Sequence, residues 1–144
     1  MQDRKKIRIL VIDDDDTFRE LASMLLAEAG YAIETAEDAI EGGKALLTRN
    51  FDLVISDINM PYMNGLELAS LLSSDEKTAS VPLILASSRM DVETISKAVA
   101  LRAADYLIKP GLVTDAIGLG LLGLVLLNQI VINPAKAAAA PPAG

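Results

Sequence analysis

The chain has 144 residues, no cysteine and no histidine, and a net charge of −7 from 20 acidic and 13 basic side chains. This length suits one domain with a closed core, and the composition excludes disulfides, thiolate or imidazole metal ligands and an internal phosphohistidine. The negative charge argues against direct binding of nucleic acid, and the short charged start, unlike a signal peptide, makes the cytoplasm the expected location.

Short apolar segments alternate with segments of helical period along the chain. The predicted strands span residues 7–12, 31–35, 51–56, 81–87 and 105–109. The predicted helices span residues 17–30, 36–48, 65–74, 91–102 and about 112–132. Continuous apolar runs within the strands indicate a parallel sheet that is covered on both faces. This (βα)5 pattern predicts an α/β fold, a flavodoxin-like doubly wound parallel sheet with strand order 2-1-3-4-5.

The first predicted helix carries signals at both ends. Thr17 and Glu20 form a capping-box pattern, which predicts a helix start at Thr17, and Gly30 marks the stop. Asp15 and Asp16 precede this start and are expected to be solvated cap residues.

Carboxylates follow two of the predicted strands. Asp13 and Asp14 follow the first strand, and Asp57 follows the third. In the predicted strand order these two strands are neighbours at the point where the order reverses, so the three carboxylates should meet in one crevice. Ser87 and Lys109 reach the same edge from the fourth and fifth strands. Hard oxygen ligands of this kind favour Mg²⁺ and phosphoryl chemistry.

Four motifs in this order and spacing resemble the receiver domain of two-component response regulators, with its single-domain chemotaxis members as the nearest likeness. They are VIDDDD, SDINMPYMNGLEL, PLILASS and DYLIKP, and the resemblance covers about residues 5–111. It implies that Asp57 is the phosphoacceptor and that Asp13 and Asp14 hold Mg²⁺, with Mn²⁺ as a substitute. The backbone carbonyl of Asn59 would be the third protein ligand of the metal.

The resemblance also implies a switch and a partner. Ser87 would bond the phosphoryl group, Lys109 would lie beside it, and the Tyr106 ring would move between exposed and buried positions. Asn59 and Arg89 occupy positions that tune the phosphoryl lifetime, although Arg89 has the alternative of being simply exposed. The phosphoryl group would come from a sensor histidine kinase or a phosphotransfer protein. Phosphorylation would remodel the surface of the fourth helix, fifth strand and fifth helix.

The loop after the third strand is expected to position Asp57. Met60 and Pro61 shape it, and Gly65 is expected to adopt a backbone conformation that other residues resist. Asn64 stands where the family often has aspartate, a difference from which we expect little consequence.

Other function classes fit the residues less well. A phosphatase of the haloacid dehalogenase type needs an acid two residues after its nucleophile, where this chain has Asn59. We therefore expect a signalling switch and not an enzyme that acts on an external substrate. A flavin or nucleotide binder would not place four aspartates at its phosphate loop. A phosphorylation-independent adaptor or dimerisation module on the same fold remains the alternative.

The predicted fifth helix departs most from the family. The receiver domain is expected to span residues 1–133, followed by an Ala/Pro-rich tail or linker over 134–144, and no charged residue occurs from 116 to 132. An outward stripe of this helix is too apolar for water, which predicts a homodimer centred on Ile117, Leu121 and Leu124. A transmembrane span is marginal in length, so membrane contact is a weaker alternative, as is docking onto a further domain or partner.

Overall fold

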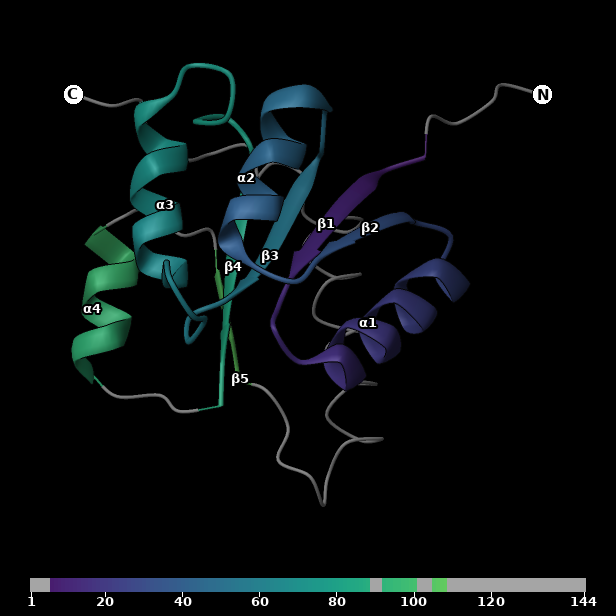
Figure 1. Cartoon of the computed structure of the whole chain (residues 1–144), viewed down its shortest axis with the longest axis horizontal. Helices are drawn as coiled ribbons and strands as arrows, with labels where there is room; N and C mark the ends of the chain where they lie inside the picture. Colours follow the sequence, from purple (N-terminus) through teal and green to yellow (C-terminus); the bar gives the residue numbers. More distant parts are fainter. Residues whose placement is uncertain (1–5, 89–91, 101–104, 109–144) are drawn as a thin grey trace.

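The computed structural model of the protein describes residues 6–88, 92–100 and 105–108, in which strands and helices alternate (Figure 1). The strands described are β1 (Arg8–Ile12), β2 (Ala32–Ala36), β3 (Leu53–Asp57), β4 (Leu83–Ser87) and β5 (Asp105–Ile108). The helices described are α1 (Asp16–Glu28), α2 (Ala39–Thr48), α3 (Gly65–Ser74) and α4 (Val92–Ala100). The predicted fifth helix and the tail over 134–144 lie outside the described residues.

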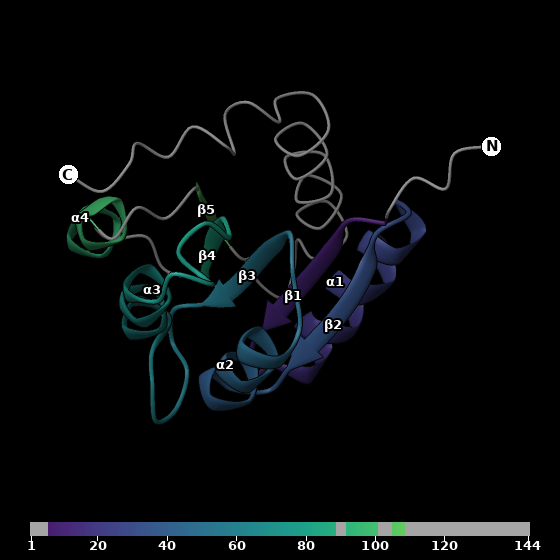
Figure 2. The ribbon, with the colours of Figure 1, turned by 90° about the horizontal axis from the view of Figure 1, so that it is seen from above.

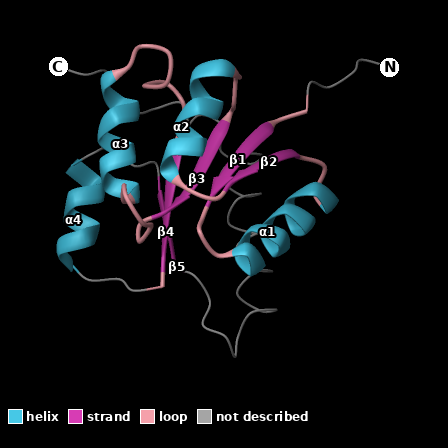
Figure 3. Ribbon diagram, in the orientation of Figure 1, coloured by secondary structure: helices cyan, strands magenta, loops and turns pink. Residues whose placement is uncertain are grey.

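The strands form one parallel sheet in the order β2-β1-β3-β4-β5, which confirms the predicted topology (Figure 3). Helix α1 covers one face of the sheet, and α2, α3 and α4 cover the opposite face (Figure 2). This is the doubly wound arrangement, because successive right-handed βα units pass to either face of the sheet.

Successive residues of β1 point to opposite faces of the sheet and enter two separate cores. Ile9 and Val11 pack with the buried face of α1, whose members are Phe18, Ala22 and Leu26. Leu10 and Ile12 pack with buried side chains of α2 and α3, among them Leu46 and Leu68. Because both faces are buried, the strand reads as a continuous apolar run, as the sequence predicts.

Helix α1 begins earlier than its capping-box pattern predicts. Asp15 is the N-cap, with its Oδ1 accepting hydrogen bonds from the backbone N–H groups of Thr17 at 2.9 Å and Phe18 at 3.2 Å. The predicted start at Thr17 is therefore wrong, because an aspartate two residues earlier already satisfies the first free N–H groups. The predicted stop is confirmed: Gly30 adopts φ +97° directly after the C-cap Ala29.

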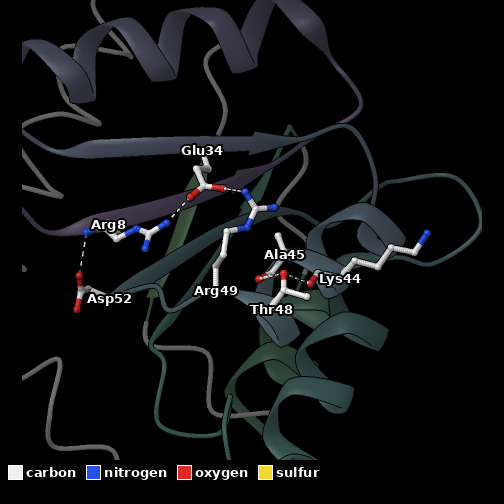
Figure 4. Close-up of polar contacts among 7 residues, drawn as sticks. All are labelled: Arg8, Glu34, Lys44, Ala45, Thr48, Arg49 and Asp52. Carbon is white, nitrogen blue, oxygen red and sulfur yellow. Dashed lines mark hydrogen bonds and ion pairs between the residues drawn. The ribbon is translucent and has the colours of Figure 1, made fainter.

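A cluster of hydrogen bonds and ion pairs links β1, β2 and the residue after α2 (Figure 4). Glu34 on β2 accepts from the guanidinium groups of Arg8 on β1 and Arg49 after α2. The backbone N–H of Arg8 donates to Asp52 Oδ2 at 2.8 Å, and its guanidinium lies 5.4 Å from the Phe51 ring centroid. These partly exposed pairs link β1, β2 and the residues after α2 and contribute modestly to stability.

Candidate functional site

Three aspartates meet at the carboxyl edge of the sheet, as the sequence predicts. Asp13 and Asp14 follow β1, Asp57 ends β3, and one carboxylate oxygen from each lies within 4.8 Å of the others. The register explains this meeting, because β1 and β3 pair Ile12 with Ser56 and so end side by side. Asp13 and Asp57 are buried, while Asp14 is exposed.

Three carboxylates at this spacing form a suitable set of ligands for a divalent cation. At an effective dielectric constant of about 20, two unit charges 4.8 Å apart, the largest separation in the triad, repel by roughly 3.5 kcal/mol. Water screens this repulsion least at the two buried carboxylates, where a cation would remove it. Oxygen donors on a partly open site match Mg²⁺, which binds few protein ligands and keeps several waters. The residues present therefore fit this metal.

Hydrogen bonds with three other residues hold Asp13 in place. Its backbone N–H donates to the Ala36 carbonyl at 3.1 Å, and its Oδ1 accepts from the Asp15 N–H at 2.9 Å. Its backbone carbonyl accepts a hydrogen bond from the guanidinium of Arg19. The carboxylate thus projects from a backbone that is fixed before any ligand binds.

The acidic run divides into two pairs with different tasks. Asp13 and Asp14 belong to the triad, whereas Asp15 caps α1 and Asp16 forms an ion pair with Arg19. The expectation that Asp15 caps the helix is confirmed. Asp16 lies in the first turn of α1, where the helix dipole favours a negative charge.

The loop after β3 is closed by backbone hydrogen bonds. The Ile58 N–H donates to the Ala86 carbonyl, and the Gly65 N–H donates to the Ile58 carbonyl, each at 2.9 Å. A Cβ on Gly65 would lie 2.2 Å from the Asp57 carbonyl oxygen, so only glycine fits here. The expectation of an unusual conformation at Gly65 is wrong, because its φ is not positive; close approach of the backbone imposes the glycine.

The unusual conformation in this loop falls on Tyr62, with φ 68°. The Met63 N–H donates to the Pro61 carbonyl at 2.8 Å, which makes a three-residue turn with Tyr62 at its centre. The Tyr62 side chain is 90% exposed. Nothing in the sequence singles out this position, because tyrosine rarely adopts positive φ.

The other predicted site residues divide into described and undescribed ones. Ser87 ends β4 and is buried, one residue beyond Ala86, which pairs with Asp57. Asn59 is exposed in the loop after β3, and the backbone of Tyr106 pairs with Leu85. The remaining predicted residues lie outside the described part of the chain: Arg89, Lys109, Ile117, Leu121 and Leu124.

The profile of the response regulator receiver domain matches residues 9–116. The chain belongs to this family. A receiver domain is a signalling switch and not an enzyme that turns over an external substrate, and here it carries the acidic pocket suited to magnesium. In the part of the domain that the structure describes, no helix is long and apolar enough to cross a membrane.

Curated and solved relatives agree with this assignment. The receiver domain is 32% identical over 108 residues to the two-component response regulator-like protein PRR73 of rice (Oryza sativa), covering 74% of this chain but only 14% of PRR73. The chemotaxis protein CheY4 of Vibrio cholerae is 29% identical, with a TM-score of 0.73 over 85% of this chain and 100% of CheY4. The Mn²⁺-bound form of response regulator Rcp1 is 15% identical and shares the fold, with a TM-score of 0.76 over 88% of this chain and 96% of Rcp1.

One residue that contacts the aspartate triad was not predicted from the sequence. Arg19 contacts both the Asp13 carbonyl and the Asp16 carboxylate. The available signal was its position three residues after Asp16 on the predicted helix, a spacing at which opposite charges meet. The contact with Asp13 depends on the turn that precedes the helix, which periodicity does not reveal.

Proposed function

We propose that this receiver domain accepts a phosphoryl group on Asp57 from the phosphohistidine of a sensor histidine kinase or phosphotransfer protein. Asp13, Asp14, Asp57 and the backbone carbonyl of Asn59 would hold the Mg²⁺ that the transfer requires, and Mn²⁺ would be able to replace it. The supporting observation is the meeting of three carboxylates from two strands within 4.8 Å of one another. Membership of the receiver family supports the same assignment.

The chemistry is an in-line transfer to a carboxylate. An oxygen of Asp57 attacks phosphorus, the bond between phosphorus and the donor imidazole nitrogen breaks, and the electron pair of that bond leaves with the imidazole. Magnesium would supply the positive charge that offsets repulsion between two anionic reactants. The hydrogen bonds of Asp13, together with the closed loop that follows Asp57, keep the two carboxylates in position.

Ser87 and Lys109 are proposed to bind the phosphoryl group once it is on Asp57. The burial of Ser87 at the end of β4 supports its part, and Lys109 follows Ile108, which pairs with Ser87. Tyr106 would then move inward and change the surface of α4, β5 and the predicted fifth helix. Asn59 and Arg89 would set how long the phosphoryl group survives. Nuclear magnetic resonance shifts confined to the loop after β3, with α4 and β5 unaffected, would contradict this switch.

Labelling with radioactive acetyl phosphate tests the phosphoacceptor. We expect Mg²⁺-dependent labelling of the wild type, none of Asp57→Asn, and wild-type labelling of the control Asp52→Asn. Asp52 contacts the backbone N–H of Arg8 before β3 begins, far along the strand from the triad, so the control makes the same chemical change outside the site. Circular dichroism should show that both variants fold. Equal labelling of Asp57→Asn and wild type would refute the assignment.

We also propose that the receiver domain forms a homodimer through the apolar segment predicted as its fifth helix. The absence of charge from residue 116 to 132 supports this, because an apolar stripe is stable in water only when it is covered. Sedimentation at micromolar concentration should show a dimer without phosphorylation, and Leu121→Glu should dissociate it. Leu47→Glu is the matched control, since Leu47 is already exposed on α2. A wild-type monomer would refute the proposal.

A further inference from the structure

The carbonyl of Asp13 lies between two regular hydrogen-bonding patterns. Asp13 follows the last residue of β1, and the first backbone acceptor of α1 is Asp15, whose carbonyl accepts from the Arg19 N–H at 3.0 Å. The Asp13 carbonyl thus lies in the connection between the end of β1 and the first acceptor of α1. Because Asp13 is fully buried, its carbonyl needs a donor from elsewhere in the protein.

The side chain of Arg19 supplies that donor. One terminal nitrogen of its guanidinium donates to the Asp13 carbonyl, and the other donates to the Asp16 carboxylate. Its side chain is only 14% exposed, whereas that of Asp16 is 81% exposed. The planar guanidinium of Arg19 thus links Asp13, a member of the triad, to Asp16 in the first turn of α1.

We propose that Arg19 is a positioning residue for the metal site and acts through its bond to the Asp13 carbonyl. This inference rests on the proposed binding of a divalent cation by the aspartate triad. The bond fixes the backbone from which the Asp13 carboxylate projects, while the ion pair keeps the Asp16 carboxylate on the helix. Asp13 and Asp14 then present two carboxylates in a fixed arrangement.

An electrostatic role of Arg19 predicts the opposite result. A guanidinium near the triad repels a cation, so removal of its charge alone would tighten metal binding. Removal of the positioning bond would weaken binding, because partners that orient metal ligands typically contribute 10- to 100-fold to affinity. The direction of the change in affinity therefore distinguishes the two roles.

The experiment measures Mn²⁺ binding to the full chain by electron paramagnetic resonance, in which free Mn²⁺ gives the observed signal. We expect Arg19→Gln to raise the dissociation constant on the order of tenfold. Arg19→Lys keeps the charge but loses the planar fork with two separate terminal nitrogens, so an intermediate loss is expected. Arg49→Gln makes the same change in the pair with Glu34 and should leave the constant unchanged.

Two further measurements separate positioning from general stability. Asp16→Asn weakens the ion pair but keeps the bond to the Asp13 carbonyl, so it should change Mn²⁺ affinity less than Arg19→Gln. Urea denaturation without metal reports the stability of each variant. Unchanged or tighter Mn²⁺ binding by Arg19→Gln would overturn the inference, even if the variant were less stable. An equal loss in Asp16→Asn, or wild-type affinity in Arg19→Lys, would overturn it as well. Absence of Mn²⁺ binding by the wild type would instead refute the proposed function.

Discussion

Replacement of Gly65 by alanine places a methyl group against the backbone of Asp57, the proposed phosphoacceptor. The added Cβ would lie 2.2 Å from the Asp57 carbonyl oxygen and 3.0 Å from Ile58 Cα, while ordinary contact begins at 3.4 Å. The approach to the oxygen is thus about 1.2 Å too short. Both neighbours are backbone atoms, so no side-chain rotation relieves the contact, and the loop itself must move.

The energetic effect follows from that movement. A shift of this size would break the 2.9 Å hydrogen bond from the Gly65 N–H to the Ile58 carbonyl, at a cost of about 1 kcal/mol. Overpacking adds about 1–3 kcal/mol, and the better helix propensity of alanine returns up to about 1 kcal/mol. We therefore expect Gly65→Ala to lower the free energy of unfolding by about 1–4 kcal/mol.

Urea denaturation and labelling with acetyl phosphate test the two consequences together. A displacement of about 1 Å at Asp57 should slow labelling at least about tenfold, since misplacement of this size reduces rates strongly. Gly43→Ala is the matched control, because a Cβ there meets nothing within 4 Å, and it should raise the free energy of unfolding by about 0.5–1 kcal/mol. Wild-type stability and labelling in Gly65→Ala would refute the reasoning.

Substitutions at three further positions probe other features of the fold. The buried hydroxyl of Tyr31 has no hydrogen-bond partner among the described residues, so Tyr31→Phe should raise the free energy of unfolding by about 1 kcal/mol in urea. Burial raises the pKa of Tyr31 above 10.0, so the folded state holds this proton more tightly than the unfolded state and loses stability as pH rises past 10. Tyr31→Phe should remove that loss. An unchanged dependence of the free energy of unfolding on alkaline pH would contradict this. Tyr62→Gly should raise the melting temperature by relieving positive φ, worth about 1 kcal/mol, whereas Tyr62→Ala, which keeps the strain, should not. Asn64→Ala should lower the free energy of unfolding by about 1 kcal/mol because Asn64 and Glu67 form a capping box, whereas Asn64→Asp should retain the cap. Equal stability of the two variants would contradict this role.

The sheet and the acidic triad could be predicted from the sequence because both depend on the order of apolar strands and on the residues that follow them. Apolar runs locate strands, and parallel topology brings their carboxyl ends together, so Asp13 and Asp57 could be paired without coordinates. The start of α1 was less accessible, since several consecutive residues are good N-caps and the choice depends on the turn that Asp13 makes. The close approach of Gly65 to the Asp57 carbonyl and the hydrogen bond from Arg19 to the Asp13 carbonyl could not be predicted, because both depend on distances between segments.

The pairing of β1 with β3 also has a thermodynamic consequence for the folding of the chain. These strands are separated by α1, β2 and α2, so bringing Asp57 beside Asp13 closes a long loop and carries its entropic cost. A cation held by all three carboxylates, as proposed, would find its full site only after this closure and would therefore favour the folded chain over the unfolded one. Such a ligand shifts the folding equilibrium by mass action, by about 2.7 kcal/mol at one hundred times its dissociation constant. Free divalent cation would then add to the stability of the folded domain, in addition to its part in the proposed phosphorylation of Asp57.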